Sequence, residues 1–239
     1  MKISAAIITL NEERNLPRAL KSLAGVADEI IVVDSGSTDG TRAIAERAGA
    51  RFIAHDWEGY ARQKNFAIAS ATYDWVLSLD ADEELTPALC AEIEQLKSTD
   101  GNSVAGYTTP RLAHYCGKWI HHSGWYPDRK VRLYDRRRAR WVGEFVHESV
   151  RVDGPVAQLR GDLLHYTCDS IEQHRVTVDR YTTLAAKEAL GRGRRGSLVA
   201  LLVLPPWKFF ETYVLRAGFL DGGAGLTIAR MAAYYVYLK

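Results

Sequence analysis

The sequence has few cysteines and almost no excess charge. Its three cysteines, Cys90, Cys116 and Cys168, form no Cys-x-x-Cys pair, and an odd number without such a pair predicts a reducing compartment and no disulfide framework. The net charge of the 239 residues is only +2, which argues against a protein whose whole surface binds nucleic acid. What the chain does have is 47% hydrophobic and 25% charged residues, so it can bury a core of its own.

Long apolar runs are also missing. The longest charge-free stretch of the C-terminal part, Gly196 to Trp207, contains Pro205 and Pro206 and falls well short of the about 20 residues that a spanning helix needs. The run Ile3 to Leu10 is followed at once by polar residues with no small-residue cleavage site, so it predicts a strand rather than a signal peptide. Neither stretch predicts a transmembrane segment.

The small net charge hides an uneven distribution. Residues 192–239 carry seven basic and two acidic side chains, a net +5, which leaves −3 for the rest. Aromatic and aliphatic residues are frequent in the same segment. This composition suits a helix lying on an anionic leaflet, although packing against the body of the protein or against a second subunit would give the same pattern.

Strand and helix patterns alternate over the first hundred residues. Short β-rich runs are Ile3–Thr9, Glu29–Asp34, Ala50–Ala54 and Trp75–Leu79, and helical spacing covers Leu16–Leu23, Thr41–Ala48, Tyr60–Ala71 and Pro87–Leu96. Strands that are joined through helices pair in parallel by right-handed crossovers. The expected fold is therefore a doubly wound α/β sheet with its ligands at the carboxyl ends of the strands.

After Gly101 the pattern changes. Short strands are predicted at Val104–Thr109, Val131–Tyr134, Arg140–Val142 and Asp162–Tyr166, and they read as a mixed or antiparallel extension of the sheet. A helical pattern from Ser170 to Leu190 precedes a glycine- and arginine-rich joint. We expect a catalytic domain over residues 1–168 and a helical, basic and apolar region over residues 169–239.

Polar and acidic residues lie at the ends of three of the predicted strands. They are Thr9, Asn11 and Glu12 at the end of the first, Asp34 at the end of the second, and Asp80 and Asp82 at the end of the fourth. Each set alone is compatible with a capped turn. Together, carboxylates at three strand ends would repel one another unless a cation or ligand hydrogen-bond donors compensate them.

The Asp80-Ala81-Asp82 turn has the hard oxygen ligands that Mg²⁺ or Mn²⁺ prefers. No GxxxxGK[ST] loop and no GxGxxG after a strand is present. If a nucleotide binds, its diphosphate must therefore be neutralised by metal and by basic side chains.

Four motifs now stand in order along the first hundred residues. They are Ala6 to Glu13, Ile31 to Thr41, the pair Lys64-Asn65, and Leu79 to Glu83. In sequence and spacing they resemble the inverting family 2 glycosyltransferases, which have the GT-A fold. Three later segments, Trp141 to Glu148, Leu164-His165-Tyr166 and Phe219 to Gly222, resemble the lipopolysaccharide core-biosynthesis branch, whose members add a β-glucosyl residue to inner-core heptose.

The resemblance implies roles for individual residues. Asp34 would accept hydrogen bonds from the base or ribose of a nucleoside diphosphate, and Thr9, Asn11 and Glu12 would line the same pocket. Lys64 would face the uracil or diphosphate. Asp80 would meet the ribose, and Asp82 the metal.

The general base is expected in the segment Val146-His147-Glu148-Ser149. Its start looks like HExxH, but residue 151 is Arg, so the zinc-protease interpretation fails. We favour Glu148, with Glu144 or His147 as substitutes and a purely structural pair with a nearby arginine as the alternative. His165 is either a hydrogen-bonded core histidine or, as in many GT-A enzymes, a late metal ligand.

Two further segments are candidates for acceptor binding. Trp119 and Trp125 lie in an aromatic-rich segment that would either stack on acceptor sugars or pack as a flap. Arg132 belongs to the basic run from Arg129 to Arg140, which is either a solvated turn or a site for a phosphorylated glycolipid. No nucleic-acid motif accompanies the run.

These observations predict a cytoplasmic glycosyltransferase, peripheral at the inner face of the cell membrane, that depends on Mg²⁺ or Mn²⁺. It would transfer a hexose, glucose from UDP-glucose, with inversion to a lipid-linked saccharide. The alternatives are transfer to a polyprenyl phosphate and a non-catalytic, membrane-bound sugar-nucleotide sensor. A homo-oligomer is a further expectation that the apolar tail allows.

Overall fold

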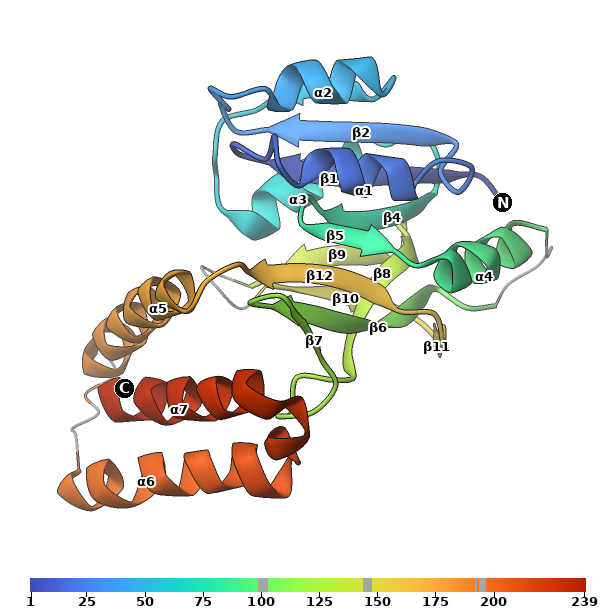
Figure 1. The fold of residues 1–239 in the computed structure, drawn as a ribbon. Coiled ribbons are helices and arrows are strands. Elements are labelled where there is room, and N and C mark those ends of the chain that lie inside the picture. The colour runs from blue at the N-terminus through green and yellow to red at the C-terminus, as the bar shows by residue number, and fades with distance from the viewer. Residues whose placement is uncertain (99–102, 144–147, 192, 194–196) are drawn as a thin grey trace. The chain divides into compact units, whose positions relative to one another are not determined.

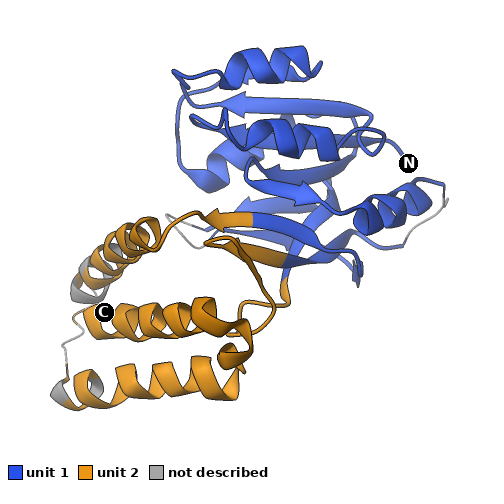
Figure 2. Ribbon diagram, in the orientation of Figure 1, with its two compact units in different colours: residues 1–111, 129–165 blue, residues 112–128, 166–239 orange. Residues whose placement is uncertain are grey.

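The chain folds into two compact units (Figure 2). The computed structural model describes residues 1–98, 103–143, 148–191, 193 and 197–239, with the backbone alone for residues 184, 187–190, 198 and 200. Unit 1 contains residues 1–111 and 129–165, and unit 2 contains residues 112–128 and 166–239. The units thus divide near the predicted boundary at residue 168, but residues 112–128 join the C-terminal segment. The division into a catalytic and a membrane-interface region stays a prediction.

Unit 1 begins with the predicted alternation of strands and helices (Figure 1). The elements are β1 (Ile3–Thr9), α1 (Leu16–Ser22), β2 (Glu29–Asp34), α2 (Thr41–Arg47), β3 (Arg51–Ala54), α3 (Tyr60–Ala69), β4 (Trp75–Asp80), β5 (Glu83–Leu85) and α4 (Pro87–Lys97). The first four strands are parallel, in the order β3-β2-β1-β4. Their carboxyl ends therefore meet at one edge, as predicted.

The sheet continues with antiparallel and mixed pairing. The later strands are β6 (Gly106–Tyr115), β8 (Asp128–Asp135), β11 (Val156–Gln158) and β12 (Leu163–Cys168), and β9 (Ala139–Val142) pairs with β10 (Ser149–Val152) in a separate hairpin. β8 runs antiparallel to β4, and the order continues β8-β6-β12-β5. The far ends of β6 and β12 belong to unit 2.

Helices cover both faces of the parallel strands. Ile3, Ala5 and Ile7 of β1 are fully buried against α1, α2 and α4, whereas Ala6 faces the opposite core with α3 and β9. Alternate side chains of a strand point to opposite faces. A strand buried on both faces accounts for the nearly continuous apolar sequence of β1 and confirms the doubly wound arrangement.

Unit 2 is mainly helical. It contains β7 (Lys118–Ile120), α5 (Ile171–Gly191), α6 (Leu198–Phe210), the π-helix η1 (Glu211–Leu215), the 3₁₀ turn η2 (Gly218–Asp221) and α7 (Gly222–Leu238). Its small core includes Tyr115, Ile120, Cys168 and Ile228. Among the described residues, no helix combines the length and apolar character needed to cross a membrane.

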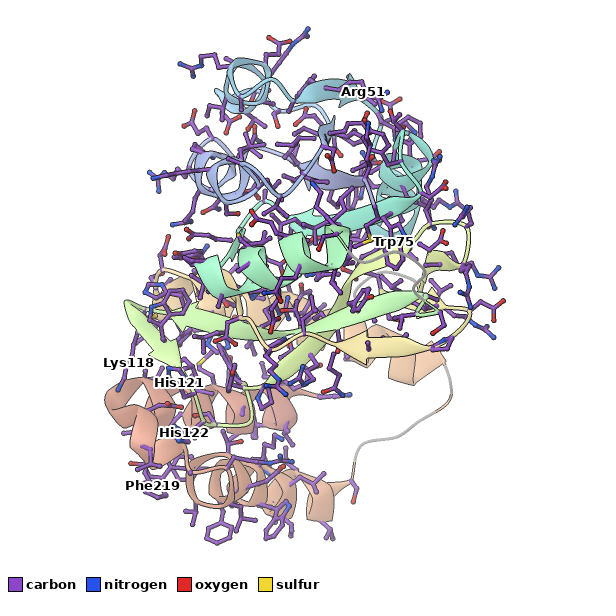
Figure 3. All side chains as sticks on the ribbon, turned by 90° about the vertical axis from the view of Figure 1, so that its right-hand side faces the viewer. Arg51, Trp75, Lys118, His121, His122 and Phe219 are labelled. Carbon is purple, nitrogen blue, oxygen red and sulfur yellow. The ribbon has the colours of Figure 1, made fainter. Side chains whose placement is uncertain are left out.

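The buried carboxylate of Asp221 ties η2 to the segment after β7. It accepts hydrogen bonds from the backbone N–H groups of His121 and His122 and from the Ser123 hydroxyl. The His122 ring nitrogen Nδ1 lies 3.0 Å from the same carboxylate. Figure 3 labels both histidines beside this turn. Within the segment Phe219-Leu220-Asp221-Gly222 noted in the sequence, Asp221 therefore stabilises the packing of η2 against the segment after β7 in unit 2.

Candidate active site

Asp80, the last residue of β4, lies between two cationic side chains. The Lys64 ammonium is 2.8 Å from Asp80 Oδ1, and Arg132 Nη2 donates to Asp80 Oδ2 at 2.8 Å. Burial raises the pKa of Asp80, but the charges of Arg132 and Lys64 outweigh it and hold that pKa well below its ordinary value. Asp80 is therefore a carboxylate at any physiological pH.

Arg132 also forms an ion pair with Glu83, which is fully buried. Its Nη2 also donates to Glu83 Oε1, and Glu83 accepts from the backbone N–H of Asp80 at 3.0 Å and from Arg111 at 3.4 Å. Burial lowers the pKa of Arg132, but Glu83 and Asp80 raise it further, so the guanidinium stays charged. Only 4% of Arg132 is exposed. This burial argues against the predicted contact of Arg132 with an acceptor and favours a role in positioning Asp80.

The predicted base, Glu148, lies next to the same lysine. Its Oε1 is 3.6 Å from Lys64 Nζ, which is itself buried and lies 4.2 Å from the centroid of the Trp141 ring. Asn65 fixes the backbone of Trp141 with two hydrogen bonds of 2.9 Å, one accepted and one donated. Glu148 directly precedes β10, which pairs with β9, and β9 in turn contacts α3.

Of the three residues considered as general base, Glu148 alone lies within the described part of the chain. Glu144 and His147 lie outside the described residues. The contact between Glu148 and Lys64 is an ion pair with a lysine, not the arginine pair that the structural alternative assumed.

Asp82 and His165 form the second pair of the site. Asp82 lies in the turn between β4 and β5, and its Oδ2 is 3.2 Å from His165 Nε2. The antiparallel register of β5 and β12 places His165 opposite Glu83, one residue from Asp82. A long-range strand pairing thus joins two residues that the sequence predicted as metal ligands.

Their donor set fits a divalent cation that shares its coordination with a substrate. A carboxylate oxygen and an imidazole nitrogen both ligate Mn²⁺, and Mg²⁺ in nucleotide sites takes one or two carboxylates plus phosphate oxygens. Within the described residues no group of three or more such side chains is present. Two protein ligands would leave positions for a diphosphate.

Glu12 adds a further carboxylate to this edge of the sheet. Burial raises the pKa of Glu12, a hydrogen bond from Asn15 lowers it, and the nearby charges of Asp82, Asp39 and Asp80 raise it, with a net increase. The ends of β1 and β4 therefore do bring acidic groups together, as the sequence predicted. A bound cation would relieve this repulsion.

The predicted nucleoside side lies at the ends of β1 and β2. Asp34 is 3% exposed; its Oδ2 accepts from the Thr9 hydroxyl at 2.7 Å and its Oδ1 from the backbone N–H groups of Gly36 and Ser37. Asn11, at φ 56°, accepts from Thr38 N at 2.9 Å. Asp34 and Asn11 thus shape this loop themselves, and their contact with a base stays a prediction.

An open hollow lies beside Asp34. It is lined by Asp34, Gly36, Ala54, His55 and Asp56. His55 Nδ1 is 2.9 Å from Gln63 Oε1, and Gln63 donates to Ser35 at 3.0 Å. Neither His55 nor Gln63 was among the predicted site residues. Since His55 follows the third parallel strand, the rule on carboxyl ends was the signal that could have found it.

Trp119 and Trp125 lie in unit 2 and pack against other aromatic rings. The Trp119 ring centroid is 4.8 Å from that of His114 and 5.4 Å from that of Tyr166, and Trp125 lies 5.5 Å from Tyr115. These contacts support the packed-flap interpretation. Acceptor stacking by either residue stays a prediction.

Comparisons with known proteins identify the family to which the chain belongs. The sequence model of the family described as "Glycosyl transferase family 2" matches residues 4–153. The chain belongs to this family. The resemblance drawn from the sequence motifs is thereby confirmed.

Relatives match along the whole chain. An "Uncharacterized glycosyltransferase" of Rickettsia felis is 35% identical over 255 residues, which cover 100% of this chain and 88% of the relative. "Lipopolysaccharide core biosynthesis glycosyltransferase LpsC" of Rhizobium meliloti is 33% identical over 245 residues, covering 100% of this chain and 90% of LpsC. This chain is thus a homologue of a lipopolysaccharide core glycosyltransferase.

A solved structure supports the fold. The crystal structure of a mycobacterial protein superimposes with a TM-score of 0.52 at 18% identity, over 77% of this chain and 73% of that chain. The predicted mixed α/β fold of GT-A type, followed by C-terminal helices, is confirmed.

Proposed function

We propose that the protein transfers a hexose, glucose from UDP-glucose, with inversion to a lipid-linked saccharide such as the inner core of lipopolysaccharide. The observation that carries the proposal is the convergence of Lys64, Asp80 and Glu148 at the carboxyl edge of the parallel strands, with the Asp82–His165 pair on the turn after Asp80. The similarity to LpsC supports the choice of acceptor.

Different residues at this edge of the sheet would bind the nucleoside and the diphosphate of the donor. The nucleoside would occupy the hollow beside Asp34, and Lys64 would exchange part of its contact with Asp80 for the diphosphate. Asp82 and His165 would hold Mg²⁺ or Mn²⁺, which when bound supplies positive charge to the diphosphate as it leaves. Arg132 and Glu83 keep the Asp80 carboxylate in place throughout.

Glu148 would act as the general base. Its carboxylate accepts the proton of the acceptor hydroxyl while that oxygen forms a bond to the anomeric carbon. The bond from the anomeric carbon to the UDP oxygen breaks on the opposite face, so the configuration inverts. Protonated Glu148 then returns its proton to solvent.

A panel of sugar nucleotides tests the donor without knowledge of the acceptor. We expect release of UDP from UDP-glucose with Mn²⁺ or Mg²⁺, slower release from UDP-galactose and UDP-N-acetylglucosamine, and none from GDP-mannose. Chelation of the metal abolishes release, and Asp82→Ala is the matched variant. Absence of both turnover and metal-dependent UDP binding would overturn the proposal.

A location at the inner face of the cell membrane is part of the same proposal. A lipid-linked acceptor is presented at a bilayer surface, and the C-terminal segment carries a net charge of +5. Cell fractionation tests the location: we expect the protein with membranes at low salt and partial release at high salt.

A further inference from the structure

Unit 2 exposes a continuous apolar stripe along α6 and η1. Most of its members are spaced three or four residues apart, as on one helix face, and their exposed fractions range from 43% to 74%. They are Val199, Leu202, Val203, Trp207, Phe210 and Val214. Leu215, Phe219 and Leu220 prolong this surface, which we call the α6 stripe. The residue labels of Figure 3 show Phe219 near its end.

An apolar helix of this length has three usual settings: the core of a domain, the bilayer interior, or an interface. Helix α6 packs against α7 (Figure 1), but the side chains of the stripe stay exposed, so the stripe is not part of the core of unit 2. Among the described residues no helix is long and apolar enough to cross a bilayer, and α6 has 13 residues where a span needs about 20. Within the described residues of unit 2, the stripe therefore has no covering surface.

The net charge of the C-terminal segment that contains the stripe favours a lipid surface over a second copy. Residues 192–239 carry seven basic and two acidic side chains, and one of the two acids, Asp221, is buried. Lys208 and Arg216 both pair with the carboxylate of Glu211. Two positive charges thus share one negative charge, and the Arg216 side chain is 61% exposed. In a two-fold interface the same positive patches would face each other, whereas an anionic leaflet attracts them.

The composition of the stripe agrees with this choice. Trp207 is half exposed and lies next to Phe210, with their ring centroids 5.8 Å apart. Tryptophan is enriched where an apolar body meets the headgroup region of a bilayer. Residues 198–207 contain no charged side chain at all.

We propose that the α6 stripe docks the protein on the surface of an anionic bilayer, with α6 lying in the plane of the headgroups. The inference deepens the proposed function, on which it rests for its membrane-bound acceptor, by naming the surface that meets the membrane. The attachment is reversible, because it combines shallow apolar burial of one helix face with charge attraction.

Vesicle flotation of the full-length protein, without any sugar nucleotide, tests the docking. We expect binding to vesicles of equal parts phosphatidylcholine and phosphatidylglycerol, much weaker binding to phosphatidylcholine alone, and release at high salt. Trp207→Ser and Leu202→Glu should each lower the partition coefficient by about tenfold or more. Trp57→Ser is the matched control, because Trp57 is equally exposed but lies in unit 1.

Each outcome decides. Equal flotation of Trp207→Ser, Leu202→Glu and the parent, or no flotation of the parent, overturns the proposal. A dimer in analytical ultracentrifugation that Leu202→Glu dissociates, without vesicle binding, assigns the stripe to a second copy instead. UDP-glucose hydrolysis in vesicle-free solution should be the same for Trp207→Ser and the parent. Vesicle binding without any hydrolysis would leave the docking standing and overturn the proposed function alone.

Discussion

At the residue scale, the site is a row of alternating charges. Glu83, Arg132, Asp80, Lys64 and Glu148 follow one another in ion-pair contact, from a fully buried carboxylate to a partly exposed one. Each inner member has an opposite charge on two sides, so the desolvation of each is compensated. Glu148, at the more exposed end of the row, and Lys64 next to it are the members that an entering acceptor and diphosphate would meet.

Removing the innermost carboxylate should destabilise unit 1. In Glu83→Gln the buried Arg132 keeps Asp80 but loses its second carboxylate, and breaking such a pair costs about 3 kcal/mol. Urea unfolding should show this loss in the free energy of unfolding. Glu46→Gln, which removes only an exposed pair with Arg42, should cost less than about 0.5 kcal/mol. Equal stability of the two variants would contradict a structural role for Glu83.

Glu148→Gln tests the base. Glutamine keeps the shape of the side chain but cannot accept a proton, so transfer to an acceptor should fall by about 10²- to 10⁴-fold while donor binding is kept. Steady-state transfer and calorimetric UDP binding measure the two effects separately. Near-normal transfer would move the role to Glu144 or His147.

Asp82→Ala tests the metal site. The Asp82 carboxylate is partly exposed in the turn after β4 and pairs with His165, so its removal should leave the fold intact and abolish the dependence of UDP binding on Mn²⁺. Titration calorimetry with and without Mn²⁺ measures this. Unchanged metal-dependent affinity in the variant would exclude this pair as the metal site.

At the scale of elements, a helix or strand could be predicted from the sequence where its own residues determine it, and could not where a distant partner does. β1 and β2 have the predicted bounds, since both are runs of apolar residues buried on two faces. β5 was not predicted: Glu83–Leu85 looks like an acidic turn, and it becomes a strand by pairing with residues 163–165 of β12. Short strands that depend on distant partners leave no local pattern.

The same limit applies to the site. The convergence of the polar residues at the carboxyl ends of β1, β2 and β4 could be predicted, because parallel topology alone brings these ends together. Arg132 was expected at the surface, in a basic run, because its two carboxylate partners lie 52 and 49 positions away in the sequence. The pairing of Glu148 with Lys64 likewise depends on the α3–β9 contact.

The contact between α3 and β9 can be tested at Asn65. Asn65→Ala removes both hydrogen bonds to the backbone of Trp141, so β9 loses its anchor on α3. We expect a loss of about 1–3 kcal/mol in unfolding free energy and slower transfer with donor binding retained. Ser98→Ala, which removes one exposed bond to Gln95, is the control. Unchanged transfer in Asn65→Ala would show that this anchor does not position Glu148.

At the scale of the whole molecule, the candidate residues are divided between the units. All the residues assigned to nucleotide, metal and base lie in unit 1, whereas Trp119, Trp125 and the α6 stripe lie in unit 2. If the proposed function holds, this division separates chemistry from attachment. Ligands of the two functions should then stabilise different parts of the chain, because a ligand stabilises only the unit that binds it.

Calorimetry with UDP and Mn²⁺ checks this division. At about 100 times its Kd, a ligand adds about 2.7 kcal/mol to the stability of the state that binds it, which for a unit of this size raises Tm by about 5 to 10 °C. We expect the shift in one unfolding transition, no shift with UDP after chelation of the metal, and none for Asp82→Ala. Trp207→Ser, in unit 2, should shift as the parent does. An equal shift of every transition would show instead that the two units unfold as one.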